Sequence, residues 1–237
     1  MSKILTAMRK SGLDITDVDQ RLQMIDRENL YPLPGPDQNG EFEQLANSLI
    51  NIHGGHGGQV VVFSSTYSGE GNSYVSYNCA RYLTLLLNKK VAWVDANFSH
   101  PQPKLVNSDL NLKGILAAPE TFPQLDKESG LVLFGNGNAN IKTMDALKGP
   151  SYSQFINSMR DNFFFTVIDA SPIMNSVEVA PLAQGTMGLV LVVESQRLKY
   201  EVIQHGIEKM RKQDVNVLGT VLNKRSFQLP DFLYRRL

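Results

Sequence analysis

A short glycine-containing loop in the first third of the chain has residue types that suit phosphate binding. Residues 65–73 read STYSGEGNS, after an apolar run over residues 59–64 and before a helical pattern over residues 73–87. In a strand, loop and helix of this kind, backbone N–H groups and the positive end of the helix bind phosphate oxygens. A lysine of the loop neutralises the β- and γ-phosphates, and a Ser or Thr hydroxyl binds Mg²⁺. The segment therefore predicts a nucleotide-binding loop.

The positive charge that such a loop normally supplies is missing. Gly69, Gly71 and Ser73 are present, but Asn72 stands at the lysine position, and residues 28–80 contain no lysine or arginine. An amide donates hydrogen bonds but does not neutralise a phosphate. One charge pair at about 4 Å, with an effective dielectric constant of about 20, is worth roughly 4 kcal/mol before desolvation. We therefore expect binding of ATP or ADP with Mg²⁺ to be weak or absent, and phosphoryl transfer to be inefficient.

Polar residues at the ends of later apolar runs add to the nucleotide hypothesis. Asp95, Asp169 and Asn223 each end a run of the strand type. In a parallel sheet, ligands bind at the carboxyl ends of the strands. An acid in this position is often only a helix cap or turn former. Two such acids after a glycine loop are instead typical of residues that hold Mg²⁺ beside the hydroxyl of Ser73.

The elements that must position these residues follow from the alternation of apolar runs with helical patterns. Continuous apolar strands separated by helices are typical of an α/β protein with a mainly parallel sheet and helices on both faces. The predicted strands are Val60–Phe63, Val91–Val94, Leu131–Phe134, Phe163–Ile168, Gly188–Val193 and Val217–Leu222.

The chain is predicted to divide at residue 58. Residues 1–58 are interpreted as an N-terminal arm with a helix, and residues 59–237 as one P-loop ATPase-like domain. Within the arm, residues 2–10 could form a short amphipathic helix that docks on a partner or a membrane surface, or packs back onto the domain. Residues 31–40 are interpreted as an irregular connection, and residues 42–52 as a helix.

Composition excludes several classes of protein. The 23 basic and 23 acidic residues balance, so net charge gives no argument for nucleic acid, and no such partner is expected. The single cysteine, Cys79, fits a reducing cytoplasm. No apolar stretch approaches the roughly 18 residues that a membrane-spanning helix needs, and the first residues do not lead into a signal peptide. We expect a cytoplasmic protein, with a peripheral position at the inner membrane as an option.

The loop and the strand-end acids together resemble the MinD/ParA-like branch of P-loop ATPases. Within that branch the chain is most similar to the bacterial tyrosine autokinases of polysaccharide synthesis and export, the BY-kinases. The resemblance covers Val60–Asn223, about 70% of the chain. It implies that Asp95 belongs to the second Walker-like motif and is the candidate catalytic residue, and that Asp169 is the Walker B acid.

The same resemblance implies the composition of the site. The metal would be held by Ser73, Asp95 and Asp169. The residues that would bind the nucleotide are Gly69, Glu70, Gly71, Asn72, Ser73 and Asn223.

Departures from the family pattern concentrate at functional positions. Ser68 replaces a loop proline, and Asn72 replaces the lysine. Asn97 replaces the second acid of an Asp-Ala-Asp motif, and Ser99 and His100 stand where arginines are usual. The pattern indicates that the site lacks the positively charged residues that would neutralise a bound phosphate.

Two further family features are absent. The family helix that carries a Glu and two Arg for ring assembly has no arginine here, because Glu43, Gln44, Ala46 and Asn47 occupy those places. The family also ends in a cluster of tyrosines, whereas only Tyr234 lies in the last 30 residues of this chain.

The leading hypothesis is a degenerate tyrosine-kinase-like cytosolic protein of exopolysaccharide or surface-polysaccharide biosynthesis and export. The resemblance implies that its partner is the cytoplasmic region of a membrane polysaccharide co-polymerase, with a homo-oligomer as a further option. The first alternative is an active tyrosine kinase or ATPase whose missing cation comes from Lys104, Lys199 or Lys224. The second is a ParA/MinD-like positioning protein.

Overall fold

The computed structural model describes residues 20, 22, 29–52, 54, 56–123, 125, 130–139 and 145–225. The amphipathic helix predicted for residues 2–10, and Tyr234, lie outside the described residues. In the described part of the chain, no helix is both long enough and apolar enough to cross a membrane.

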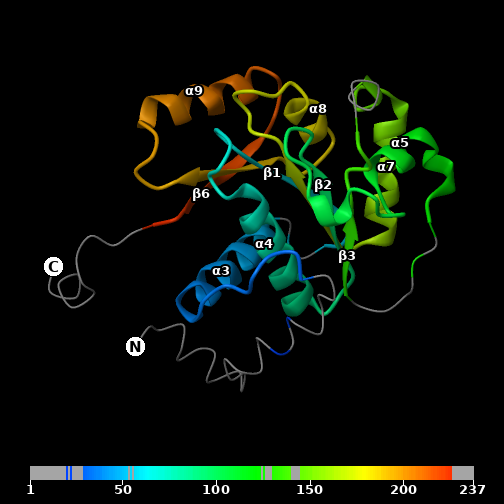
Figure 1. The fold of residues 1–237 in the computed structure, drawn as a ribbon, viewed down its shortest axis with the longest axis horizontal. Coiled ribbons are helices and arrows are strands. Elements are labelled where there is room, and N and C mark those ends of the chain that lie inside the picture. The colour runs from blue at the N-terminus through cyan, green and yellow to red at the C-terminus, as the bar shows by residue number, and fades with distance from the viewer. Residues whose placement is uncertain are drawn as a thin grey trace, which may run out of the picture.

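Six parallel strands form one sheet in the order β3-β2-β4-β1-β5-β6 (Figure 1). The central strands are buried on both faces, as the continuous apolar runs of the sequence indicate. The predicted α/β fold class is confirmed. The strands are β1 Gln59–Ser65, β2 Val91–Ala96, β3 Leu131–Phe134, β4 Phe165–Ala170, β5 Leu189–Glu194 and β6 Val217–Asn223.

Helices cover both faces of the sheet. Figure 1 shows α3 and α4 on one side, with α5, α7, α8 and α9 on the other. The helices are α3 Pro36–Ile52, α4 Asn72–Leu87, α5 Leu112–Ala117, α7 Pro150–Asn162, α8 Val179–Ala183 and α9 Tyr200–Arg211.

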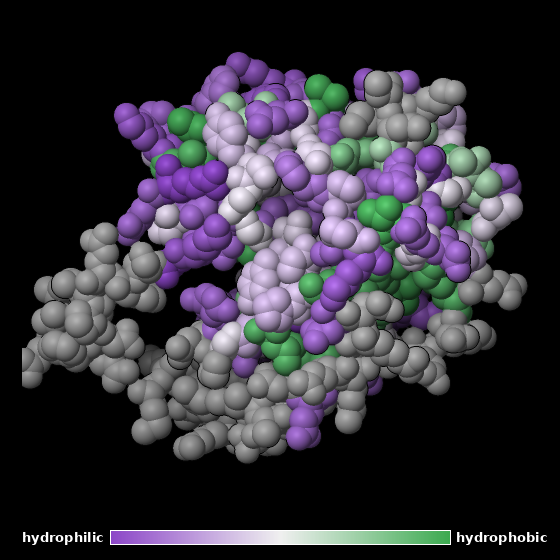
Figure 2. All heavy atoms as spheres, viewed as in Figure 1, coloured by the Kyte–Doolittle hydropathy of each residue, from purple (hydrophilic) through white to green (hydrophobic). Residues whose placement is uncertain are grey.

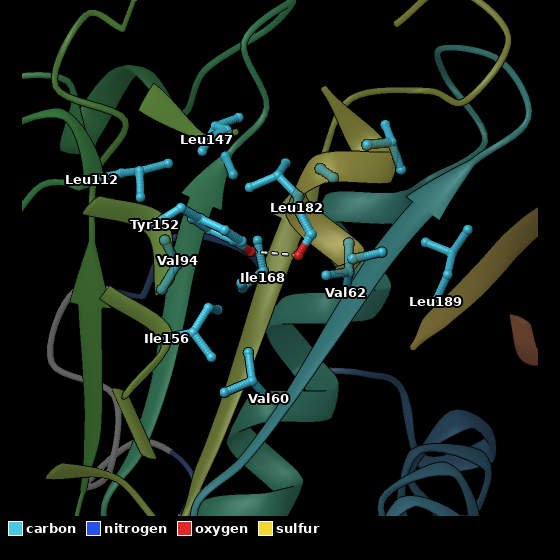
Figure 3. Packing of buried hydrophobic residues seen from close by; sticks show 14 of the residues in the cluster. Val60, Val62, Val94, Leu112, Leu147, Tyr152, Ile156, Ile168, Leu182 and Leu189 are labelled. Carbon is cyan, nitrogen blue, oxygen red and sulfur yellow. Dashed lines mark hydrogen bonds between the residues drawn. The ribbon is translucent and has the colours of Figure 1, made fainter. Parts of the chain in front are cut away.

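The period-two alternation of the strands divides the apolar interior into two cores. Val60 and Val62 of β1 point toward α7 and α8, whereas Val61 and Phe63 point toward α3 and α4. Figure 3 shows the first core, in which the hydroxyl of Tyr152 donates a hydrogen bond to the backbone carbonyl of Leu182. Outside the cores, Figure 2 shows polar side chains over much of the visible surface, with apolar ones in smaller areas.

Trp93 lies in the second core and joins β2 to α4. Its side chain is fully buried, and its indole N–H donates to the hydroxyl of Ser76 at 3.0 Å. Its ring meets the ring of Tyr77 edge to face, with centroids 5.5 Å apart. A buried indole needs such a hydrogen-bond partner.

Helix α3 begins earlier than the sequence pattern indicates. Residues 36–40 were expected to be irregular, but the helix starts at Pro36 and runs through Gly40. Proline suits the first helical position, because its missing N–H would have no partner there. The apolar face of α3 then enters the second core through Phe42, Ala46 and Leu49.

We predict that α3 contributes to the stability of the domain as a core helix. Leu49→Ala should lower the free energy of unfolding by about 2–4 kcal/mol, because it removes a buried side chain and leaves a cavity. Asn47→Ala, on the exposed face of the same helix, should change it by less than about 0.5 kcal/mol. Urea unfolding of both variants measures the difference. Equal effects would show that α3 does not share the core, and would favour the boundary predicted at residue 58.

Candidate nucleotide site

The predicted site residues meet at the carboxyl edge of the sheet. β4 lies between β1 and β2, so the loop after β1 and the acids of β2 and β4 share this edge. Asp95 and Asp169 are register partners in adjacent strands, which lie about 4.8 Å apart. The sheet order therefore places together two acids that are far apart in the sequence.

The glycines give the loop a shape that suits an anion. Gly69 and Gly71 have φ angles of 89° and 88°, in the left-handed region that favours glycine. Gly71 is the N-cap residue of α4 and supplies no side-chain cap. The first N–H groups of a helix have no acceptor within the helix, so this end of α4 can bind phosphate oxygens.

The side chains of Glu70 and Asn223 stabilise the loop through hydrogen bonds. The carboxylate of Glu70 is fully buried and accepts the N–H groups of Tyr67 at 2.8 Å and Glu194 at 3.3 Å. The amide of Asn223 donates to the carbonyl of Glu70 at 2.8 Å. These contacts tie the loop to β5 and β6. A direct role for either side chain in nucleotide binding stays a prediction.

The side chain of Asn72 contacts the ends of β1 and β4 beneath the loop. Its Nδ2 lies 2.6 Å from Oδ1 of Asp169, and 3.1 and 3.2 Å from the carbonyls of Phe63 and Ala170. Its Oδ1 is buried with no hydrogen-bond partner among the described residues. Asn72, at the position where the sequence comparison with P-loops expects a lysine, therefore binds Asp169 through a neutral amide.

Burial controls the electrostatics of the two acids. Burial is the largest cause that raises the pKa of Asp169 well above its usual value, and the negative charge of Asp95 is the second. The polar side chains of Ser73, Asn72 and Ser76 act in the opposite direction and lower it. Burial raises the pKa of Asp95 to about 6, against hydrogen bonds from the N–H groups of Gln102 and Asn97. No cation of the described residues contributes to either shift.

These groups fit Mg²⁺ and a nucleotide in part. Ser73, Asp95 and Asp169 are oxygen donors of the kind that Mg²⁺ prefers, and they would hold it here. The N–H groups at the start of α4 would hold phosphates. A bound Mg²⁺ supplies positive charge for the phosphates and for the carboxylates. The loop adds no charge of its own, because Asn72 is neutral.

Of the three lysines suspected of replacing the missing charge, Lys224 reaches the loop. Its ammonium donates to the carbonyl of Gly69 at 2.6 Å and lies 3.2 Å from the carboxylate of Glu194. Lys104 instead contacts the carbonyl of Asn29 at 3.5 Å, and Lys199 is an exposed residue before α9. Lys224 therefore lies against a loop carbonyl with its charge already paired.

Sequence reasoning missed Tyr31. Burial, followed by the negative charge of Asp169, raises the pKa of its hydroxyl. Tyr31 precedes α3 in a segment that resembled a plain connection. No local pattern marks it, because its place depends on how that segment packs on α4.

The fold is shared with solved structures of one class of ATPase. The structure of a ParA family ATPase from Chlorobium tepidum superposes with a TM-score of 0.56, at 14% identity, over 70% of this chain and 74% of that one. This protein therefore has the P-loop ATPase fold of the MinD/ParA kind. No family model matches the chain.

The homologues are more specific. The chain is 30% identical over 78 residues to the tyrosine-protein kinase CpsD of Streptococcus agalactiae, covering 33% of this chain and 34% of CpsD. It is 24% identical over 178 residues to the succinoglycan biosynthesis transport protein ExoP of Rhizobium meliloti, covering 70% of this chain and 22% of ExoP. The match thus spans about a third or less of either relative's length.

Solved kinase domains share the fold over most of the chain. The kinase domain of VpsO superposes with a TM-score of 0.66 at 20% identity, over 90% of this chain and all of that one. The Escherichia coli tyrosine kinase ETK gives 0.65 at 14% identity, over 80% and 78%. The resemblance to the BY-kinases is therefore confirmed: the homologues are BY-kinases of the CpsD and ExoP type.

We predict that Asp95 makes stability depend on pH. Its pKa is about 6 in the folded protein and near 3.8 in the unfolded chain, so the folded state binds this proton more tightly. The resulting stabilisation is complete below about pH 4 and is lost as the pH rises through 6. Relative to Asp95→Asn, the wild type should lose roughly 1–3 kcal/mol of unfolding free energy between pH 4 and 7. Urea unfolding without Mg²⁺ measures this, and parallel pH curves for the two proteins would contradict it.

Proposed function

We propose that this protein is a degenerate BY-kinase-like protein that acts without catalysis in exopolysaccharide or surface-polysaccharide biosynthesis and export. One observation carries the proposal. Asn72, at the position of the catalytic lysine, binds Asp169 as a neutral amide. Phosphoryl transfer depends chiefly on positive charge placed at the transferring group, so a site without that lysine is poorly equipped for it.

The surroundings of the site support a loss of catalysis. Asn97 replaces an acid of the family pattern, and its side-chain oxygen accepts the N–H of His100 at 3.0 Å. It therefore stabilises the turn after β2 through an uncharged contact. The site keeps the frame of a nucleotide pocket, and we propose that this frame is vestigial or serves as a weak binding switch.

The proposed partner is the cytoplasmic region of a membrane polysaccharide co-polymerase. The relatives support this choice, since one is named for succinoglycan biosynthesis and transport and others are kinases of the CpsD type. In α3, Ala46 is buried and no arginine is available for ring assembly. The protein would then lie in the cytoplasm, beside the inner membrane, and act through protein contacts.

A working kinase or ATPase is the second candidate. The contact between Lys224 and the carbonyl of Gly69 favours it, because a modest movement could bring this ammonium to a bound phosphate. Against it, Glu194 already pairs with Lys224 and also with Arg197 at 3.1 Å. Moving Lys224 would therefore give up two existing contacts.

We predict that charge at position 72 limits nucleotide affinity. Asn72→Lys should bind ATP with Mg²⁺ at least about tenfold more tightly than the wild type, since it restores a cation at the phosphates. Asn72→Met, with similar length and no charge, should not. Calorimetric titration with ATP and ADP compares the three proteins. Micromolar binding by the wild type would show that the site works without the lysine.

We predict that polysaccharide production does not need an intact metal site. In the native host, deletion of the gene should reduce surface polysaccharide, and replacement by Asp169→Asn should restore it to the wild-type level. The amide oxygen at position 169 can still accept from Asn72, so the fold should persist. Quantifying polysaccharide, alongside an unfolding curve of the variant, tests this. A folded variant that fails to restore production would mean that metal or nucleotide binding at this site is required.

A further inference from the structure

Two cationic side chains lie against the glycine loop on the side that faces the ends of β5 and β6. The ammonium of Lys224 donates to the carbonyl of Gly69 at 2.6 Å, and its Cε would lie 4.0 Å from a Cβ on Gly71. The guanidinium of Arg197 approaches the same loop, because a Cβ on Gly69 would lie 3.2 Å from its Nη1 and 3.9 Å from its Nη2. The two glycines of the loop are therefore each within reach of a positive charge.

The backbone around Arg197 is tied to the loop. Arg197 lies in the turn that follows β5, and its N–H donates to the carbonyl of Glu194 at 3.4 Å. The N–H of Glu194 donates to the carboxylate of Glu70 in the loop at 3.3 Å. The N–H of Ser195 donates to the carbonyl of Asn223, whose own amide holds the carbonyl of Glu70. These bonds keep the guanidinium beside the loop.

One carboxylate is shared between the two cations. Oε2 of Glu194 lies 3.1 Å from Nη1 of Arg197 and 3.2 Å from Nζ of Lys224. One acid compensates one of the two positive charges, and both cationic side chains are partly open to solvent, at 39% and 49% exposure. The second acid nearby, Glu70, is fully buried and binds the N–H groups of Tyr67 and Glu194. An anion that arrives from solvent therefore meets the cations before it meets Glu70.

The chemistry of this cluster suits a phosphate chain. A guanidinium has five N–H donors in a planar fork that matches phosphate oxygens. In the described part of the chain, the side chain of Arg197 donates through Nη1 to Glu194. A phosphate would compete with Glu194 for this donor, and charged hydrogen bonds of this kind are about twice as strong as neutral ones.

We propose that Arg197 and Lys224 form the phosphate-neutralising subsite of this chain, and that they bind the diphosphate or triphosphate of a nucleotide from the side of the loop opposite Asn72. The inference rests on the proposed weak binding switch and names the residues that give it affinity. Glu194 then acts as a competitor, because it occupies both cations whenever no phosphate is bound. The subsite lies away from the lysine position, so it supports binding without restoring the charge that phosphoryl transfer needs.

The test measures binding of ADP with Mg²⁺ by calorimetry in Asn72→Lys, the variant whose binding should be measurable. Adding Arg197→Gln should weaken binding about five- to tenfold, the effect of losing a charged hydrogen bond to phosphate. Adding Glu194→Gln should instead strengthen binding about two- to fivefold, because the competing carboxylate is gone. A merely structural role predicts the opposite sign, since Glu194→Gln breaks two ion pairs. Weaker binding in Glu194→Gln, or an unchanged affinity in Arg197→Gln, would overturn the subsite.

Matched controls come from the far end of α9. Arg211→Gln and Glu208→Gln make the same charge changes in the last turn of that helix, where both residues are exposed. Twelve helical residues span about 18 Å, which exceeds the Debye length of about 8 Å at physiological salt. Each control should therefore change the affinity for ADP by less than about twofold. Control effects as large as those at Arg197 and Glu194 would show a general charge effect and overturn the subsite.

A second measurement does not depend on position 72. In the otherwise wild-type chain, titration with pyrophosphate and with AMP is followed by the phosphorus NMR signals of the ligands. Pyrophosphate should bind at millimolar concentration and more tightly than AMP, and Arg197→Gln should weaken its binding about fivefold. Absence of pyrophosphate binding would overturn the subsite even if Asn72→Lys binds no nucleotide. Failure of the polysaccharide experiment would leave these results intact, so the two proposals can fail separately.

Discussion

Two carboxylates buried side by side at the end of adjacent strands are the constraint around which this site is arranged. The register of β2 and β4 fixes Asp95 opposite Asp169, and burial makes the charged form of each costly. The protein meets that cost with neutral donors. Backbone N–H groups bind Asp95, and the side-chain amide of Asn72 binds Asp169.

The cationic groups near the loop lie on its other side. Lys224 and Arg197 both pair with Glu194 near the ends of β5 and β6, and Lys224 also donates to the loop carbonyl of Gly69. The loop thus lies between an acidic edge, with no cation among the causes acting on it from the described residues, and a basic edge where two cations share one acid.

The strands and their terminal acids could be predicted because the signals are local. An apolar run ending in an acid identifies Asp95 and Asp169, and the alternation with helices gives the sheet class. The start of α3 could not, because Gly40 and the prolines before it are typical of a turn, and only packing of Phe42 and Leu49 against α4 overrides that preference. The inward orientation of the Asn72 side chain and the packing of Tyr31 on α4 depend on contacts between distant segments, which no spacing in the sequence encodes.

Ser76 lies between Asp169 and the single tryptophan of the chain, Trp93. Its hydroxyl accepts the indole N–H of Trp93, and it is also one of the groups that lower the pKa of Asp169 against the effect of burial. The emission of a buried indole responds to the polarity and hydrogen bonding around it. The protein therefore contains an intrinsic fluorophore close to Asp169, and events at that acid can be followed by tryptophan fluorescence without attaching a label.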